Sequence, residues 1–128
     1  ATILKDKVDF ISFHYYEDLD KLDANIKTMR TEIINKPLVL QEFGISSYSG
    51  FWKPFGTSEE DQANYYKKAQ KLIASNKLQF MSWTLYDFVK VPKEVVGKLP
   101  WRRNTQKQFG FINVNGAKKA SFKYISKQ

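Results

Sequence analysis

The carboxylate of Glu42 is the side chain of this sequence best placed to do chemistry. It lies in the tetrapeptide Gln41-Glu42-Phe43-Gly44, directly after the apolar run 37–40. An ionised carboxylate without a partner resists burial, so a buried strand tolerates one mainly where its charge is used. Glu42 therefore marks a candidate site, at the point where such a strand gives way to a turn.

Other polar and aromatic side chains follow two further apolar segments. His14 and Tyr16 end the first segment, and Trp83 lies at the end of the third, with Tyr86 just beyond it. The carboxyl ends of parallel strands meet at one face, so these side chains are expected around one cleft with the carboxylate. Taken alone, His14 also fits a structural residue, and Tyr16 or Trp83 a core aromatic. Their order on successive strand ends is the more specific signal.

The hydrophobic pattern predicts the strands that carry these residues. Short apolar runs rich in β-branched and aromatic residues place strands at Val8–Phe13, Leu38–Phe43 and Leu78–Leu85. Two amphipathic segments separate them. The order strand, helix, strand, helix, strand implies right-handed crossovers and a parallel sheet, so the predicted fold class is α/β.

The two helices have recognisable ends. Apolar residues three or four apart predict the first helix over 19–33, with Asp18 or Asp20 as its cap. The second helix is expected to open at a capping box, Thr57–Glu60, and to run to about Ser75. Both helices are long enough to serve as crossovers between the strands.

Two long connections, residues 45–55 and 89–108, follow the second and third strands. Connections of this length are usually functional or disordered, and their aromatic content argues against disorder. The aromatic residues in or beside them that could bind a ligand are Tyr48, Phe51, Trp52, Tyr86 and Trp101, with packing within the loops an equally good interpretation. The tail is expected to form an extended piece, a turn at Asn115-Gly116 and a closing helix over 118–127.

The composition is that of a folded chain, expected to form one domain over residues 1–128. It has 42% hydrophobic and 16% aromatic residues, too many for a disordered protein. No apolar run reaches the roughly 18–20 residues of a membrane span, so no membrane association is expected. The sequence has no cysteine and one histidine, and it lacks dinucleotide and phosphate-loop motifs. We therefore expect no metal site and no cofactor.

Positive charge is concentrated at the end of the chain. Residues 1–89 hold 11 Lys/Arg and 12 Asp/Glu, whereas residues 90–128 hold 10 and 1. An unrelated α/β module that binds nucleic acid or another polyanion would explain this asymmetry. A solvated lysine-rich end explains it without a partner, and the segment has no nucleic-acid-binding motif. We therefore expect no nucleic acid partner.

The ordered strand ends resemble a known family. A strand with His-x-Tyr, one with Glu-Phe-Gly and one with Ser-Trp occur at Val8–Tyr16, Lys36–Gly44 and Phe80–Phe88. This series is similar to the last three β/α units, six to eight, of clan A glycoside hydrolases, the family 5-like cellulases and mannanases. Residues 109–120 also look like the tail after strand eight in these enzymes. The resemblance covers nearly the whole chain and implies the C-terminal part of a (β/α)8 TIM barrel.

The resemblance also implies roles for four residues. Glu42 matches the nucleophile of a retaining β-glycosidase, and Tyr16 matches the tyrosine that hydrogen-bonds it. His14 matches a strand-six histidine near the reducing-side subsites, and Trp83 a stacking floor for the bound sugar. The residue types suit this chemistry, because a phenol that donates to a carboxylate favours its ionised, nucleophilic form.

The second carboxylate of the reaction is missing. Retaining hydrolysis needs an acid/base carboxyl about 5–5.5 Å from the nucleophile, and this clan carries it in an Asn-Glu pair on strand four. No Asn-Glu occurs here, and neither Glu17 nor Asp87 matches that position. We therefore expect an inactive piece of a hydrolase of β-linked oligo- or polysaccharide, glucan or mannan. A missing N-terminal barrel half, or self-association, would complete it.

The location and the main alternative function follow from the same resemblance. The parent protein is expected to be secreted or periplasmic. The chain begins at Ala1, which fits either a processed protein or a piece of a longer one. A non-catalytic carbohydrate-binding or scaffold domain would keep the aromatic cleft without turnover.

Overall fold

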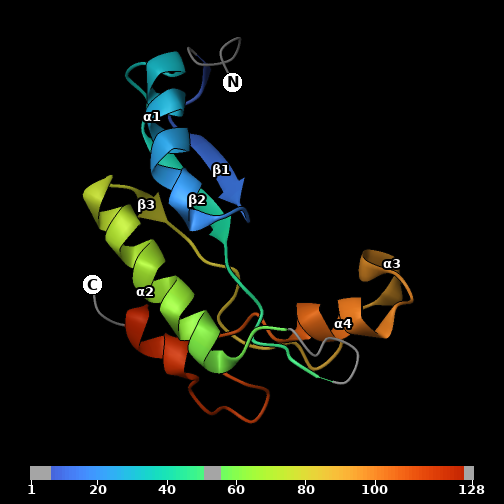
Figure 1. Ribbon diagram of the computed structural model, residues 1–128. Coiled ribbons are helices and arrows are strands. Elements are labelled where there is room, and N and C mark those ends of the chain that lie inside the picture. The colour runs from blue at the N-terminus through green and yellow to red at the C-terminus, as the bar shows by residue number, and fades with distance from the viewer. Residues whose placement is uncertain (1–6, 51–55, 126–128) are drawn as a thin grey trace. The chain divides into compact units, whose positions relative to one another are not determined.

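The computed structural model describes residues 7–50 and 56–125 (Figure 1). Trp52, one of the predicted substrate-binding residues, lies outside the described residues. The chain divides into two compact units, the first made of Ala1–Phe43 and Lys68–Ser82, the second of Gly44–Lys67 and Trp83–Gln128. The single domain expected over residues 1–128 stays a prediction.

The sheet of the first unit is parallel, as predicted. β1 (Ile11–Tyr15), β2 (Leu38–Phe43) and β3 (Gln79–Phe80) lie in the order β1-β2-β3 and pair in parallel (Figure 1). β2 has the predicted bounds, and Leu40 at its middle is fully buried. The strand with the longest apolar run thus takes the central position, where both neighbours pair with it.

The third strand is shorter than the predicted Leu78–Leu85. Met81 still donates its backbone N–H to the Leu40 carbonyl at 2.9 Å. At the next residue the Ser82 hydroxyl donates to the Phe43 carbonyl at 3.2 Å. A side-chain hydrogen bond thus joins the chain to β2 beyond the end of β3.

The first strand is displaced from the predicted Val8–Phe13. Its ladder begins where the Ile11 N–H donates to the Pro37 carbonyl at 2.9 Å. Phe10, expected in the strand, is 53% exposed. The strand instead extends to Tyr15, so the two residues gained at its end lie beside β2.

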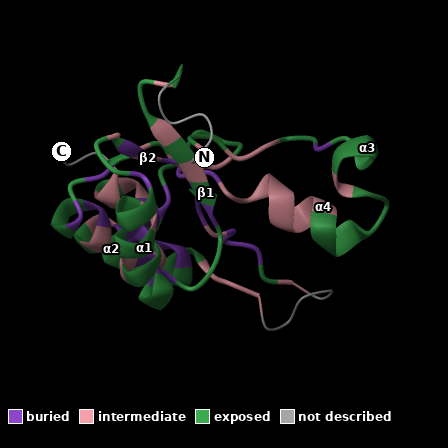
Figure 2. Cartoon of the chain, turned by 90° about the horizontal axis from the view of Figure 1, so that it is seen from above, coloured by how far each residue is buried: buried purple, intermediate pink, exposed green. Residues whose placement is uncertain are grey.

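The helix after β1 begins as predicted. A 3-10 turn, η2 (Leu19–Lys21), leads into α1 (Leu22–Glu32). Asp18 is the cap, because its carboxylate accepts a backbone N–H of the first turn at 3.0 Å. Leu22 and Ile26, one turn apart, are fully buried. Figure 2 shows buried and exposed residues mixed along α1, as expected for an amphipathic crossover.

The capping box of α2 (Glu59–Ser75) lies one residue later than predicted, while the predicted end of the helix is confirmed. The Ser58 hydroxyl accepts the Asp61 N–H at 3.1 Å, and the Asp61 carboxylate accepts the Ser58 N–H at 2.8 Å. Thr57 instead donates its hydroxyl to the Ser46 carbonyl. The sequence offers two overlapping capping boxes, Thr57 with Glu60 and Ser58 with Asp61. The helix begins at Glu59, so only the second pair forms the box.

The connection 89–108 contains two helices that the sequence did not predict, α3 (Lys93–Val96) and α4 (Pro100–Lys107). Proline at the first position of a helix costs no hydrogen bond, so Pro100 is a start signal for α4. The closing helix predicted over 118–127 is, within the described residues, a 3-10 turn, η3 (Ala120–Tyr124). None of the helices in residues 7–50 and 56–125 combines the length and hydropathy of a membrane span.

The second unit contains an ion pair among its most buried groups. The side chains of Lys119 and Asp87 are 2% and 7% exposed, and Nζ lies 2.7 Å from Oδ1. The Gly110 N–H donates to the same Asp87 oxygen at 2.8 Å, and Lys119 Nζ donates to Ser47 Oγ at 2.9 Å. We call these four residues the Asp87–Lys119 network. It joins backbone and side-chain groups from three connections of the second unit.

A buried amide organises the rest of this core. Gln62 of α2 is fully buried, and its Nε2 donates to the Ile45 carbonyl at 2.9 Å. Its Oε1 accepts the hydroxyl of Ser121, also fully buried, at 2.8 Å. The rings of Tyr66 and Phe111 pack beside them with centroids 4.5 Å apart. Buried polar groups here are satisfied within the protein, as folding requires.

Candidate active site

A break in strand register brings His14 opposite Glu42. β1 and β2 pair Phe13 with Leu40 and then His14 with Glu42, with an irregularity between Phe13 and His14. Without it, His14 would face Gln41. Because a one-residue shift turns a strand's side chains to the other face, the irregularity is what pairs an imidazole with the carboxylate.

The carboxylate of Glu42 has a different neighbour at each oxygen. The Tyr16 hydroxyl donates to Oε1 at 2.5 Å, and His14 Nδ1 lies 3.6 Å from Oε2. The first distance is a short hydrogen bond, and the second is an ion-pair contact that requires a protonated imidazole. The hydrogen bond implied by the family resemblance is therefore present in the first unit. The catalytic roles of the three residues stay predictions.

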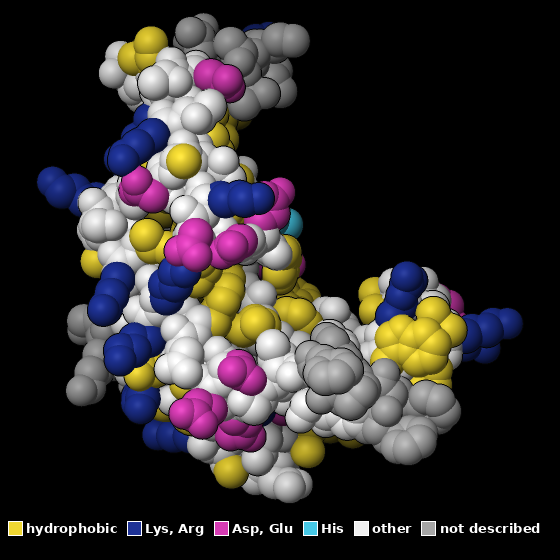
Figure 3. Space-filling view, in the orientation of Figure 1, with side chains coloured by type: hydrophobic (Ala, Val, Ile, Leu, Met, Phe, Trp, Pro, Cys, Tyr) yellow, Lys and Arg dark blue, Asp and Glu magenta, His cyan; other side chains and the backbone are white. Residues whose placement is uncertain are grey.

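This cluster is accessible to a ligand. The side chains of Glu42 and His14 are 29% and 54% exposed, and Tyr16 is 49% exposed. The only histidine of the chain reaches the surface in Figure 3, where it is drawn in cyan. A carboxylate oriented by a phenol and still open to solvent is suited to attack an electrophilic carbon.

Tyr15, the residue before Tyr16, has a phenol with a structural role. Tyr15 is buried, and its hydroxyl donates to the Asp18 carbonyl at 2.7 Å. Burial raises the pKa of its phenol, and the negative charge of Glu17 adds to this effect. Tyr15 is the last residue of β1 and Tyr16 follows it, so the chain leaves the strand between a phenol that holds the fold and one that reaches the carboxylate.

The predicted substrate-binding aromatics that the structure describes belong to the second unit. The Trp83 ring packs on Phe88 with centroids 5.8 Å apart, and its Nε1 is buried without a hydrogen-bond partner among the described residues. Tyr86 and Trp101 are 56% and 38% exposed. Tyr48 is buried and its hydroxyl accepts the Asn104 amide at 3.3 Å, so it packs within its loop. These residues do not touch one another in any contact described for this unit.

Gly44 follows the carboxylate-bearing strand for a steric reason. A Cβ added there would lie 2.5 Å from the Trp83 carbonyl oxygen and 2.7 Å from the Tyr66 hydroxyl. Contacts below 3.0 Å are essentially never made by real Cβ atoms, so only glycine fits. The turn does not require a positive φ at this residue, since the positive-φ glycines of the described chain are Gly97 and Gly116. The glycine expected to permit a turn instead permits a close approach.

Sequence reasoning missed the Asp87–Lys119 network and the helices around Trp101. No local signal distinguishes Lys119 from its exposed neighbour Lys118. The start of α4 could have been found from Pro100, which precedes Trp101 and a run of residues without further helix breakers. Among residues 7–50 and 56–125, no cluster of His, Asp and Glu has the arrangement of a metal site.

The family comparison assigns the chain. A profile of the glycosyl hydrolase catalytic core matches residues 2–98, which is most of the chain. The protein therefore belongs to the glycosyl hydrolase catalytic core family. The predicted α/β fold of parallel β/α units from a TIM barrel is confirmed, since solved glycoside hydrolases with this fold cover nearly the whole chain. No curated protein matches the sequence significantly.

Solved structures give the same fold at low sequence identity. A β-glucuronidase from Ruminococcus gnavus aligns with a TM-score of 0.73 and 18% identity, covering 99% of this chain and 24% of that one. A β-1,3-glucanosyltransferase from Rhizomucor miehei aligns with a TM-score of 0.63 and 13% identity, covering 93% and 44%. A β-glucuronidase from Bifidobacterium dentium aligns with a TM-score of 0.63 and 22% identity, covering 92% of this chain and 20% of that one. The chain thus spans less than half the length of each of these proteins.

Proposed function

We propose that Glu42 is the nucleophile of a retaining β-glycosidase to which this chain contributes β/α units six to eight. The observation that carries the proposal is the carboxylate held by Tyr16 and flanked by His14, with its side chain still 29% exposed. In such a reaction the carboxylate attacks the anomeric carbon and forms a covalent glycosyl-enzyme. The hydrogen bond from the phenol would orient one oxygen and leave the other free to attack.

The proposed substrate is a β-linked glucan or mannan, or a related oligosaccharide. The family profile supports a glycoside hydrolase. Two of the similar structures are a β-1,3-glucanosyltransferase and a β-glucuronidase, and both names denote enzymes of β-linked sugars. Trp83, Tyr86 and Trp101 are the proposed sugar-stacking residues, because sugars present flat C–H faces that pack on aromatic rings. We also propose that the parent protein is secreted or periplasmic.

We propose that the acid/base carboxyl comes from outside these 128 residues. Retaining hydrolysis needs two carboxyl groups about 5–5.5 Å apart, and the sequence holds no Asn-Glu pair to supply the second. The preceding barrel strands, in the same or another chain, would supply it and would cover the free edge of β1. Without them, the chain is expected to show no turnover.

The test compares the chain alone with the chain fused behind strands one to five of a family member that carries the acid/base glutamate. We expect no hydrolysis of aryl β-glycosides by the chain alone and measurable hydrolysis by the fusion. Glu42→Gln in the fusion is expected to lower kcat by about 10³-fold or more, because no covalent intermediate can form. Glu32→Gln, an exposed change at the end of α1, is the matched control.

Two results would contradict the proposal. Turnover by the chain alone that disappears in Glu42→Ala would show that the acid/base group is present in it. A fusion whose Glu42→Gln variant keeps full activity would exclude Glu42 as nucleophile. Trapping with a 2-fluoro glycoside, followed by peptide mass mapping, gives an independent readout, since the label stays on the attacking residue.

A further inference from the structure

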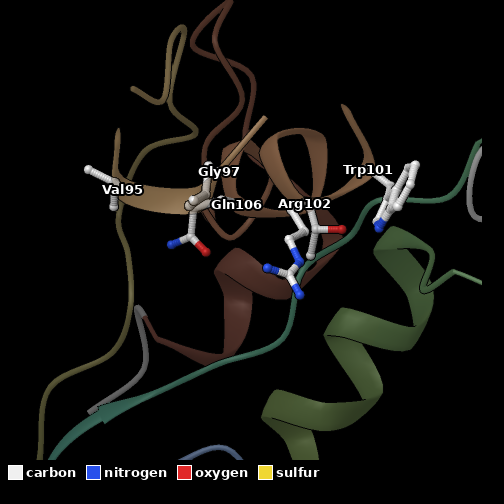
Figure 4. Close-up of a pocket in the computed structure, with 7 residues that line it drawn as sticks. Val95, Gly97, Trp101, Arg102 and Gln106 are labelled. Atoms are coloured by element: carbon white, nitrogen blue, oxygen red, sulfur yellow. The ribbon is translucent and has the colours of Figure 1, made fainter. Parts of the chain in front are cut away.

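The helices α3 and α4 line an open pocket that includes Trp101, one of the proposed sugar-stacking residues, together with residues that have no predicted role. It has a volume of about 590 Å³ and is lined from α4 by Trp101, Arg102 and Gln106 and from α3 by Val95 (Figure 4). This volume is within the usual range for small-ligand sites, about 300–1,000 Å³. The pocket lies entirely in the second unit and does not involve Glu42.

The pocket combines an apolar platform with polar groups on one helix face. Arg102 and Gln106 are four residues apart, so they lie on the same face of α4, and Figure 4 shows both ending at the pocket. Trp101 also lines the pocket and is 38% exposed. Within the part of the chain that the structure describes, no ion pair or hydrogen bond engages the Arg102 guanidinium. An unengaged guanidinium can bind a planar anion, and an indole elsewhere in the same pocket can pack against a sugar ring.

A second pocket beside α4 is also rich in basic residues. Arg103 lines a smaller pocket of about 310 Å³ with Lys90, Lys93 and Glu94. Its Nε is buried and has no hydrogen-bond partner among the described residues. A buried N–H without an acceptor is costly and is expected to be satisfied by a ligand or by water. Residues 89–108 carry six Lys/Arg and one Glu, so the segment attracts negative charge.

We propose that the α3–α4 pocket is a binding site for an anionic sugar residue, a carboxylate or sulfate ester, on the glycan that the enzyme acts on. The Arg102 guanidinium binds the anionic group, Gln106 donates to a neighbouring hydroxyl, and Trp101 packs against the ring. The inference rests on the proposed glycosidase function and extends it from neutral to acidic β-glycans. A nucleic acid is the less favoured ligand, because strand binding uses several stacking aromatics along a basic groove, whereas this pocket offers one.

The experiment measures binding to the 128-residue chain by isothermal calorimetry at low salt. The ligands are three β-linked tetrasaccharides that differ at one residue, which is glucose, glucuronate or glucose 6-sulfate. We expect the acidic ligands to bind at least about tenfold more tightly than the neutral one, with the preference decreasing as salt screens the charges. A stronger preference for glucuronate indicates the planar carboxylate, and a stronger preference for the sulfate ester indicates the tetrahedral anion.

Variants separate the contribution of the Arg102 charge from that of the Trp101 ring. Arg102→Gln is expected to remove the preference for acidic ligands while keeping neutral binding. Trp101→Ala is expected to weaken all three ligands. Lys71→Gln, an equal charge change at an exposed position of α2, is the control and is expected to keep the preference. Circular dichroism of each variant verifies that it is folded.

Three results would overturn the inference. These are equal binding of the neutral and acidic ligands, a preference that Arg102→Gln leaves intact, and displacement of the acidic tetrasaccharides by a single-stranded oligonucleotide at equal charge concentration. None of these results depends on turnover. A failure of the Glu42 proposal would therefore leave this test valid, and failure of this test would leave Glu42 as the candidate nucleophile.

Discussion

Two carboxylates that follow strands of this protein have opposite surroundings. Glu42 at the end of β2 keeps 29% of its side chain exposed and lies against two side chains, the phenol of Tyr16 and the imidazole of His14. Asp87 is 7% exposed and binds the Lys119 ammonium and the Gly110 N–H. Both residues looked alike in the sequence, as acids just beyond an apolar run.

The difference indicates which acid is free to react. Asp87 is held by the Lys119 ammonium and the Gly110 N–H, and removing the ammonium leaves a buried carboxylate without its counter-charge. Glu42 accepts the hydrogen bond of Tyr16 at one oxygen and has His14 Nδ1 at 3.6 Å from the other, and its side chain is 29% exposed. The structure therefore predicts that changes in the Asp87–Lys119 network alter stability, whereas changes in the Glu42 cluster alter activity.

The largest expected effect is on the buried pair. Lys119→Met should destabilise the second unit by about 3–5 kcal/mol, because it leaves the Asp87 carboxylate buried without its cation. Urea unfolding followed by tryptophan fluorescence measures the loss, since all three tryptophans of the chain lie in this unit.

The matched control is Lys98→Met, which removes the same charge from an exposed position of the same unit. Its stability should change by less than about 0.5 kcal/mol. Equal unfolding midpoints for the Lys119→Met variant and the unmodified chain would show that the network does not stabilise the fold.

A smaller loss of stability is expected at the glycine that follows the Glu42 strand. Gly44→Ala places a methyl group 2.5 Å from the Trp83 carbonyl oxygen, and that backbone atom has little freedom to move. Overpacking of this kind costs about 1–3 kcal/mol. Ser49→Ala, at an exposed position of the following loop, is the control. A Gly44→Ala variant with an unchanged urea midpoint would contradict the steric explanation.

The adjacent residues Tyr15 and Tyr16 test the distinction between a side chain that stabilises the fold and one that serves the candidate site. Tyr16→Phe removes the hydrogen bond to Glu42 and should lower kcat/KM of the fusion enzyme about tenfold, since bonds to charged groups contribute about 1.5–3 kcal/mol. Its stability should be nearly unchanged because the ring is 49% exposed. Tyr15→Phe should do the reverse, because its phenol is buried and donates to the Asp18 carbonyl. Equal effects of the two changes on both readouts would remove the distinction.

The sequence was sufficient for the elements whose pattern is local. The period of apolar residues predicted β2 and the end of α2, and the order of elements predicted the parallel sheet. It could not predict the register break between Phe13 and His14, because that depends on pairing with another strand. It also placed a long loop where α3 and α4 form, since short helices depend on tertiary packing more than on propensity.

At the candidate site, too, local features were predictable from the sequence and long-range contacts were not. The residue types on successive strand ends predicted which side chains to examine, and the hydrogen bond between Tyr16 and Glu42 is present. The burial of Lys119 was not predictable, because it differs from Lys118 only in the three-dimensional contacts of its connection. A long-range ion pair leaves no periodic signal in the chain.

The smallest expected effect concerns a third kind of carboxylate, at the exposed start of α2. The pKa of Asp61 lies below its ordinary value of 3.8, first because it accepts the Ser58 N–H and then because it accepts the Ser58 hydroxyl. A group whose pKa is lower in the folded state stabilises the fold above its unfolded pKa and loses that contribution as the pH falls through its folded pKa. Ser58→Ala should therefore cost about 1 kcal/mol at neutral pH through the lost helix cap.

The pH profile distinguishes the cap from ordinary surface charge. Asp61→Asn should lower stability slightly at neutral pH, and its difference from the unmodified chain should vanish once the pH falls below the folded pKa, where both side chains are uncharged. Urea midpoints measured from neutral pH down to about pH 2.5 follow this convergence. Ser49→Ala, an exposed change that removes no ionisable group, is the control and should give the same difference at every pH. If the Asp61→Asn difference persisted in acid, the capping carboxylate would not be stabilised in its ionised form. Asp61 would then give no support to the distinction between carboxylates that stabilise the fold and those that can react, and Asp87 and Glu42 alone would carry it.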